Sequence, residues 1–320
     1  MRTSMNPLEL LPPGGLWLDT DGQPIQAHGG SMLYHGGSYY WYGENKNGDS
    51  WLPECNIAWD GYRVESIGIN CYSSGDLIHW KNEGIVLSSV KDDPGHDLHT
   101  GRVLERPRLL FNRKTGKFVL WMHIDTLDYL YARTGIAISD SPTGPFSYIG
   151  SLRPDGCDSR DMTVFQDTDG KAFLLYSSEW NSELHISPLA DDYLQPAGPM
   201  VRAFVTNEKN KGPESPALFK HRNRYYLITS RCTGWDPNPA EYAVAEAPTG
   251  PWKDMGNPCI GPGADTTFDS QGTFVFELAD RPGTFIFMAD RWDKRNLKDS
   301  RYLWLPIHMD GHSGSVRLKR

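Results

Sequence analysis

The chain has 320 residues, of which 38% are hydrophobic and 22% are charged, and its formal net charge is −8. This acidic balance, with no basic block larger than the tail at 317–320, argues against nucleic acid and anionic membranes as partners. The cysteines are odd in number and show no CxxC spacing, so they predict buried or free thiols, and we expect neither a metal nor a cofactor.

Residues 1–14 are expected to form an N-terminal extension of a single catalytic domain that spans 1–320. The extension has no apolar core long enough for a signal peptide, and no run in the chain approaches a membrane span. The chain as given is therefore expected to be cytoplasmic, or secreted if a leader was removed from it.

A polar residue followed by two short apolar runs recurs five times along the chain. The leading residues of the copies are His28, Glu105, Asp161, Glu214 and Gln271. In each copy a Gly-containing or polar turn joins the two runs, which is typical of a β-hairpin. A repeat of this kind predicts a propeller in which every copy is one blade.

Further strand-like segments fill the gaps between the copies, at 68–74, 134–140, 183–189, 241–247 and 301–307. Together with the two repeat strands they give about four strands per copy, as a propeller blade requires. No convincing amphipathic helix is found. The predicted fold class is therefore all-β, a five-bladed β-propeller.

The gap between the first and second copies is the longest, and its surplus falls around 45–66 and 88–102. Long insertions in a rigid scaffold usually carry specificity or are disordered. We expect the first insertion to lie over the site, with a disordered surface excursion as the alternative.

The five leading residues are expected to converge, because the innermost strand of each propeller blade lines the central axis. Three of them are carboxyls, and carboxyls packed together cannot all ionise cheaply, so at least one pKa rises. A proton donor beside charged carboxylates is the arrangement that glycoside hydrolysis needs.

Each leading residue also has a purely structural interpretation. A Glu before Pro at a strand start can cap backbone amides or pair with a nearby arginine, such as Arg106 or Arg160. Taken alone, His28 fits a structural hydrogen-bonding residue better than a base, and Gln271 is considered only because of its repeat position. The Asp-Thr-Asp-Gly stretches at 19–22 and 167–170 lack the Glu of a calcium loop and are predicted to be turns.

Longer strings narrow the prediction to a known family. The strings QAHGGSMLYHGGSYYWYGE, LERPRLLFN, SRDMTVFQDTDGKAFLLYSSEWN, ESPALFKHRNRYYLITSRCTGWDPN, DSQGTFVFEL and FMADRWDKRNLKDSRYLWLPI resemble the exo-β-1,3-galactanase branch of glycoside hydrolase family 43, and also its neighbouring branch. The resemblance covers Gly15 to Ile307. It implies an inverting enzyme that releases terminal galactose from plant-type β-1,3-galactan or arabinogalactan oligosaccharides.

The resemblance also implies roles for the leading residues. Glu214 matches the general acid, and Asp161 matches the residue that orients the acid and tunes its pKa. Most of the family has a catalytic-base Asp in the first blade, where this chain reads QAH at 26–28. In the galactanase branch a last-blade glutamine, here Gln271, holds the water, with an imidic tautomer as one route to deprotonation. Glu105 matches a second-blade glutamate that contacts the sugar and could share the base role.

The expected substrate contacts are Gln26, His28, Tyr129, Glu179, Asn181, Thr233 and Trp235. Two alternatives stay open at this point. One is the same fold acting as an α-L-arabinofuranosidase or β-D-galactofuranosidase, because the neighbouring branch shares most of the motifs. The other is a non-catalytic sugar-binding propeller, which the absent first-blade Asp suggests and the intact acid argues against.

Overall fold

The computed structural model describes residues 14–310 and 314–320, except 56 and 58. Most of the predicted N-terminal extension, residues 1–13, lies outside the described residues. The described chain consists of strands and turns, with three single-turn 3-10 helices at Pro154–Gly156, Ala264–Thr266 and Leu297–Asp299. None of its helices is long and apolar enough to cross a membrane.

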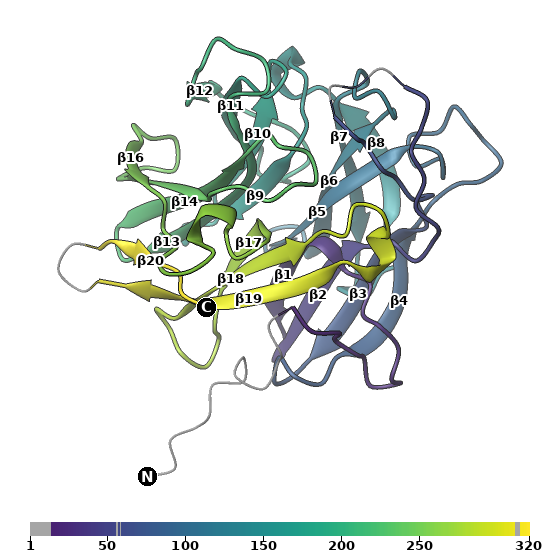
Figure 1. Ribbon diagram of the computed structural model, residues 1–320, viewed down its shortest axis with the longest axis horizontal. Helices are drawn as coiled ribbons and strands as arrows, with labels where there is room; N and C mark the ends of the chain where they lie inside the picture. Colours follow the sequence, from purple (N-terminus) through teal and green to yellow (C-terminus); the bar gives the residue numbers. More distant parts are fainter. Residues whose placement is uncertain (1–13, 56, 58, 311–313) are drawn as a thin grey trace.

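The strands form five four-stranded antiparallel sheets, each made from consecutive strands of the chain (Figure 1). The first two sheets contain β1 (His28–His35), β2 (Ser38–Glu44), β3 (Gly68–Ser74) and β4 (Lys81–Ser88), then β5 (Val103–Asn112), β6 (Lys117–Asp125), β7 (Arg133–Ser139) and β8 (Ser147–Leu152). The third contains β9 (Met162–Gln166), β10 (Ala172–Ser178), β11 (Glu183–Pro188) and β12 (Val201–Ala203). The last two contain β13 (Pro213–His221), β14 (Arg224–Arg231), β15 (Glu241–Ala245) and β16 (Lys253–Gly256), then β17 (Gln271–Glu277), β18 (Phe285–Arg291), β19 (Arg301–Met309) and β20 (Val316–Arg317).

The first strands of the five sheets form a closed ring. Strand β1 contacts β5, β5 contacts β9, β9 contacts β13, β13 contacts β17, and β17 contacts β1. The predicted five-bladed propeller is therefore confirmed, and so are the five additional strands, which correspond to β3, β7, β11, β15 and β19.

Strands in the middle of a blade read as continuous apolar runs because neighbouring blades cover both of their faces. Every residue of β10 is buried, whereas all of β16, at the outer edge of its blade, is exposed. Each fully buried large apolar side chain contributes about 1.5–3 kcal/mol to folding. The core accordingly lies between the blades, in layers that separate adjacent sheets.

Four of the five innermost strands contain a register irregularity just after the leading residue. In three of them the next residue has a positive φ, namely Gly29 at 56°, Arg106 at 54° and Ser215 at 51°. Such bulges re-aim side chains, and a non-glycine residue in this region costs about 1–3 kcal/mol. The repeated bulge sets the direction in which the leading side chains leave the ring.

The buried side chain of Arg108 ties the inner strands together near the axis. Its Nη1 donates to the carbonyls of Gly29, Gly30 and Pro107, and its Nη2 donates to Thr273 O at 2.7 Å. These carbonyls belong to β1, β5 and β17. One guanidinium therefore satisfies backbone acceptors from three blades.

The interface between the last sheet and the first is closed by side chains. Tyr302 accepts a hydrogen bond from Ala27 N and donates one to Ile25 O, each at 2.9 Å. Asp290 accepts from Gly29 N at 2.7 Å and lies 3.2 Å from His28 Nδ1. Because these contacts join the last sheet of the chain to the first, we call them the closing interface of the ring.

Candidate active site

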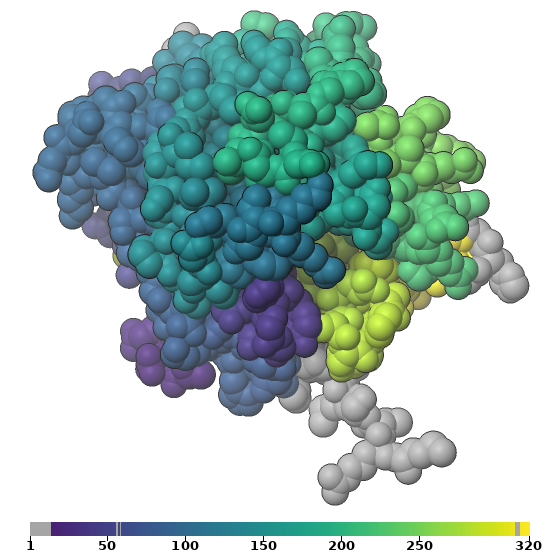
Figure 2. Space-filling view, turned by 180° about the vertical axis from the view of Figure 1, so that it is seen from behind, coloured from purple at the N-terminus to yellow at the C-terminus, as the bar shows by residue number. Residues whose placement is uncertain are grey.

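A cavity of about 740 Å³ opens at one end of the ring. On the face seen in Figure 2, segments from the purple, blue, green and yellow-green parts of the chain meet, so distant stretches of sequence share this surface. The cavity is lined by Glu44, Ile57, Trp59, Glu105, Arg106, His123, Asp128, Tyr129, Arg160, Asp161, Trp180, Asn181, Lys209, Asn210, Lys211, Glu214, Cys232, Thr233, Gly234, Trp235, Gln271 and Trp292. Its volume lies within the range of roughly 300–1,000 Å³ that is usual for small-molecule sites.

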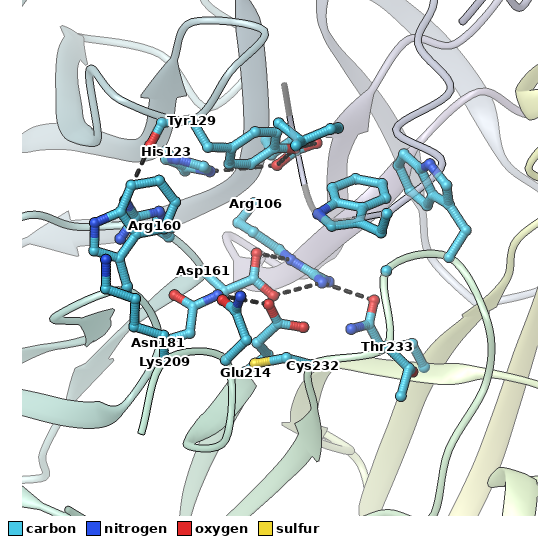
Figure 3. A pocket seen from close by; sticks show the side chains of 18 of the residues that line it. Arg106, His123, Tyr129, Arg160, Asp161, Asn181, Lys209, Glu214, Cys232 and Thr233 are labelled. Carbon is cyan, nitrogen blue, oxygen red and sulfur yellow. Dashed lines mark hydrogen bonds and ion pairs between the residues drawn. The ribbon is translucent and has the colours of Figure 1, made fainter. Parts of the chain in front are cut away.

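Glu214, at the start of β13, provides the proton donor. Its Oε1 accepts a hydrogen bond from Asn181 Nδ2 at 2.7 Å (Figure 3). Burial, followed by the negative charge of Asp161, raises the pKa of Glu214 to about 8. The carboxyl is therefore protonated at neutral pH, as a general acid must be.

Asp161, directly before β9, is held in place by three hydrogen bonds. Arg106 donates from Nε to Oδ1 at 3.0 Å and from Nη2 to Oδ2 at 2.7 Å. The backbone N–H of Ser215 also donates to Oδ2, at 3.0 Å. Since Ser215 follows Glu214, Asp161 fixes the backbone next to the acid while its charge keeps the acid protonated.

Glu105, in β5, is the carboxylate best suited to stay ionised. Tyr129 donates its hydroxyl proton toward Oε1 at 3.1 Å, and His123 Nδ1 lies 3.3 Å from Oε2. Burial opposes ionisation, but the hydrogen bond from His123 and the charge of Arg63 hold the pKa of Glu105 well below its usual range. Glu105 therefore offers a negative acceptor to the cavity.

His123 supports this charge from β6. Burial lowers its pKa, but bonds to Asp125 and Glu105 outweigh that effect and raise the pKa to about 9. The Nε2 atom lies 2.9 Å from Asp125 Oδ2. The imidazolium is thus the form present at neutral pH, with both ring nitrogens as donors.

The orientation of the Gln271 amide follows from its neighbours. Its Oε1 lies 2.8 Å from Arg106 Nη2 and 3.1 Å from Trp292 Nε1, both of which can only donate. The atom that faces them must be the carbonyl oxygen, so Nε2 lies toward Ser230 Oγ at 3.0 Å. Both acceptor positions of the amide are taken, and what remains is one N–H donor. An imidic tautomer would place an O–H against two donors, which disfavours it.

Four of the expected substrate contacts, Tyr129, Asn181, Thr233 and Trp235, line the cavity. The first insertion also reaches it, as expected, through Ile57 and Trp59. Trp59 packs edge-on against Tyr129 and Trp235, with ring centroids 5.9 and 6.0 Å apart.

Three expected contacts lie elsewhere, and their assignment needs correction. His28 is fully buried in the closing interface, against Asp290 and Tyr302. Gln26 is buried behind the wall, where its side chain donates to Lys298 O and accepts from Lys46 N. Glu179 is exposed and does not line the cavity. Only four of the five leading residues therefore meet, because the first-blade leader is used to close the ring.

A second set of lining residues, which the repeat did not predict, lies across the hairpin from the leading residues. Glu44 pairs with His28 in the strand register, and His123 pairs with Glu105. Glu44 Oε1 accepts from Arg106 N at 3.0 Å, and its Oε2 lies 2.6 Å from Lys46 Nζ. The sequence could have indicated these positions, because Glu44 and His123 are the last residues of the second runs of their copies.

Glu105, His123 and Asp161 offer possible ligand atoms within 4.8 Å of one another. These atoms already have charged or hydrogen-bonding partners, because His123 is protonated and Arg106 occupies Asp161. The donors present fit an ion-pair network better than a metal site. All five cysteines are free thiols, and none has a partner for a disulfide.

A propeller whose mouth holds a proton-donating carboxyl, Glu214, beside an ionised carboxylate, Glu105, has the paired carboxyls of a glycoside hydrolase. The family model for glycosyl hydrolases family 43 matches residues 23–275. The chain belongs to this family.

Comparison with solved structures gives close relatives within the family. A family 43 β-1,3-galactosidase in complex with galactodeoxynojirimycin is 39% identical with a TM-score of 0.86, covering 97% of this chain and 98% of that chain. An exo-β-1,3-galactanase from Phanerochaete chrysosporium, in complex with galactose, is 35% identical with a TM-score of 0.81. That match covers 96% of this chain and 66% of the longer fungal chain. Among curated proteins, a xylosidase/arabinosidase of Bacteroides ovatus is 25% identical over 230 residues, covering 59% of this chain and 67% of the relative.

Proposed function

We propose that the protein releases terminal galactose from β-1,3-linked galactan, such as plant-type galactan or an arabinogalactan backbone, with inversion at the anomeric carbon. The observation that carries the proposal is the presence in one cavity of a carboxyl protonated at neutral pH, Glu214, and a carboxylate kept ionised, Glu105. The substrate class is supported by the two solved relatives that act on β-1,3-galactosides.

In this mechanism Glu214 donates its proton to the glycosidic oxygen as the bond to the anomeric carbon breaks. A water attacks the opposite face of the sugar and loses a proton, so that the sugar is released with inverted configuration. Asp161 raises the proton affinity of the acid and holds the backbone beside it through Ser215 N. Its own carboxylate is occupied by Arg106, which leaves it as a positioning residue.

We assign to Glu105 the removal of a proton from the attacking water. Among the other carboxylates that line the cavity, Asp161 is bound by Arg106, Glu44 is paired with Lys46, and Glu214 is protonated. The fourth, Asp128, accepts hydrogen bonds from Thr126 Oγ1 and Leu130 N through its Oδ1. Gln271 has no free acceptor and contributes an N–H that can orient the water. The aromatic wall of Trp59, Trp235 and Trp292 provides faces on which sugar rings can stack.

The proposal is tested by proton NMR with catalytic amounts of protein and β-1,3-galactobiose. Release of α-galactose before mutarotation supports the reaction, the linkage and the stereochemistry together. Initial release of β-galactose would contradict inversion. Cleavage of α-L-arabinofuranosides or β-D-galactofuranosides without cleavage of galactobiose would replace the substrate and keep the roles of the residues.

A further inference from the structure

Arg63 is carried by the first insertion and reaches the wall of the cavity from outside the repeat. Its side chain is buried, and its guanidinium carbon lies 4.8 Å from the ring centre of Tyr129, 4.9 Å from Trp59 and 5.5 Å from Trp235. Stacking of a guanidinium on aromatic faces is favourable and fixes its position. The three rings therefore form a cage that holds the Arg63 charge beside the cavity.

A directional hydrogen-bond chain runs from this guanidinium to Glu105. Arg63 Nη2 donates to the Tyr129 hydroxyl at 2.5 Å. Because the Tyr129 oxygen accepts this bond, its own proton is directed to Glu105, 3.1 Å from Oε1. Burial raises the pKa of Tyr129 well above its usual value, so the hydroxyl remains a donor at all working pH values.

Arg63 differs from the other cations around Glu105. Lys46 is paired with Glu44, Arg106 with Asp161, and His123 with Asp125 as well as with Glu105. Within the described part of the chain, no carboxylate lies within ion-pair distance of Arg63, and its buried Nε has no hydrogen-bond partner. Its charge is therefore not cancelled by a carboxylate of its own.

The charged and titratable groups that act on Glu105 come from several elements. They are Glu44 at the end of β2, Lys46 in the loop after β2, Arg63 in the insertion, Arg106 in β5, His123 and Asp125 in β6, Tyr129 in the loop after β6, Asp161 before β9 and Glu214 in β13. The acidic members of this group favour protonation of Glu105, and the paired cations are partly cancelled by them. The hydrogen bond from His123, followed by the charge of the caged guanidinium, keeps the pKa of Glu105 low.

We propose that Arg63 is a positioning residue which, through Tyr129, orients the Glu105 carboxylate and keeps it ionised for deprotonation of the attacking water. This inference rests on the proposed function. It assigns to the insertion a part in catalysis, since the insertion supplies both the arginine and one ring of its cage.

The test compares pH profiles of kcat/KM for wild type, Arg63→Gln and Arg63→Lys on β-1,3-galactobiose. A base must be ionised to act, so the acidic limb of the profile reports the pKa of Glu105 in the free enzyme. We expect the wild type to show this limb only at very low pH. Arg63→Gln should move the limb to higher pH and lower kcat/KM at pH 7 by about 10- to 100-fold, as expected on loss of a hydrogen bond from a charged donor.

Arg63→Lys keeps the positive charge but loses the planar, forked guanidinium. The pH of its acidic limb should therefore lie closer to that of the wild type than the pH of the Arg63→Gln limb does. The alkaline limb, which belongs to Glu214, should be unchanged in both variants. A matched control is Arg133→Gln, because Arg133 also lies over a tyrosine ring, Tyr131, at 5.2 Å, but does not line the cavity.

An acidic limb that is the same in Arg63→Gln and in wild type, with thermal unfolding showing both folded, would overturn the inference. If Arg63→Gln does not fold, Tyr129→Phe decides, because it removes the hydroxyl that links Arg63 to Glu105. An acidic limb of Tyr129→Phe at the same pH as that of the wild type would then overturn the inference. Wild-type protein that fails to cleave galactobiose would overturn the proposed function instead, and that outcome is seen before any variant is compared.

Discussion

Arg106 and Asp161 form a two-point ion pair between neighbouring blades, with donor–acceptor distances of 3.0 and 2.7 Å. The same arginine donates to Gln271 Oε1 at 2.8 Å, and its backbone N–H donates to Glu44. One residue with a positive φ thereby links four blades at the floor of the cavity. Removing a partner from such a buried pair leaves an uncompensated charge, so the site behaves as one electrostatic unit.

The role of the acid is tested by Glu214→Gln. We expect kcat on β-1,3-galactobiose to fall about 10²- to 10⁴-fold, because general acid catalysis contributes a factor of this size. A β-galactoside with a dinitrophenolate leaving group should be hydrolysed at a rate much closer to that of the wild type, since such a group leaves without protonation. Glu246→Gln, at an exposed position, is the control. Equal losses on both substrates would contradict the assignment.

The pH profile should fall on its alkaline side as Glu214 loses its proton. Its pKa is raised to about 8, and the acid works only when protonated, so kcat/KM should decline as the pH rises through about 8. Asp161→Asn removes the neighbouring negative charge and frees the charge of Arg106. Both changes favour ionised Glu214 and should move the alkaline limb to lower pH. A limb that moves to higher pH would exclude Asp161 as the cause of the raised pKa.

The base is tested by Glu105→Ala with added azide. Loss of the carboxylate should lower hydrolysis about 10²- to 10⁴-fold, because the water is no longer deprotonated. Azide needs no deprotonation and fits the space of the lost side chain, so it should restore turnover and yield α-galactosyl azide. Product analysis by NMR distinguishes this outcome from simple damage to the site, in which azide would have no effect.

Gln271→Glu separates the two interpretations of the last-blade glutamine. A carboxylate can still accept from Arg106 and Trp292, and the Ser230 hydroxyl can turn to donate to it, so the fold and sugar binding should be preserved. We expect a smaller loss of kcat than in Glu105→Ala, since only an orienting N–H disappears. A greater loss than in Glu105→Ala, with galactose still bound in calorimetry, would instead favour Gln271 as the group that deprotonates water.

Tyr302→Phe tests the closing interface. The change leaves the buried N–H of Ala27 and the carbonyl of Ile25 without their partner. A buried polar group that loses its hydrogen bond costs about 1–3 kcal/mol, and denaturant unfolding should show a loss of this order. Tyr34→Phe, at an exposed tyrosine, should leave the unfolding midpoint unchanged. Similar midpoints for the two variants would mean that these bonds do not stabilise the ring.

The convergence of Glu105, Asp161, Glu214 and Gln271 was predictable because a repeat assigns equivalent positions to residues that are far apart in sequence. The place of His28 was not, since its partner Asp290 lies in the last blade and no local pattern links the two. Arg63 lies in an insertion without a counterpart in other blades, so no periodicity could select it. The orientation of Gln271 depends on two donors that only the folded structure brings together.

The closing interface also has a consequence for synthesis on the ribosome. Trp17, Trp41 and Trp80, near the start of the chain, pack in one cluster with Tyr302 and Trp304 of β19. After Trp80, the next residues of this cluster along the described chain lie in and after β17. These indoles therefore lack their packing partners while the three middle blades are made. The nascent first blade therefore exposes an aromatic surface for most of translation. A chaperone that binds apolar surface would bind the nascent chain there.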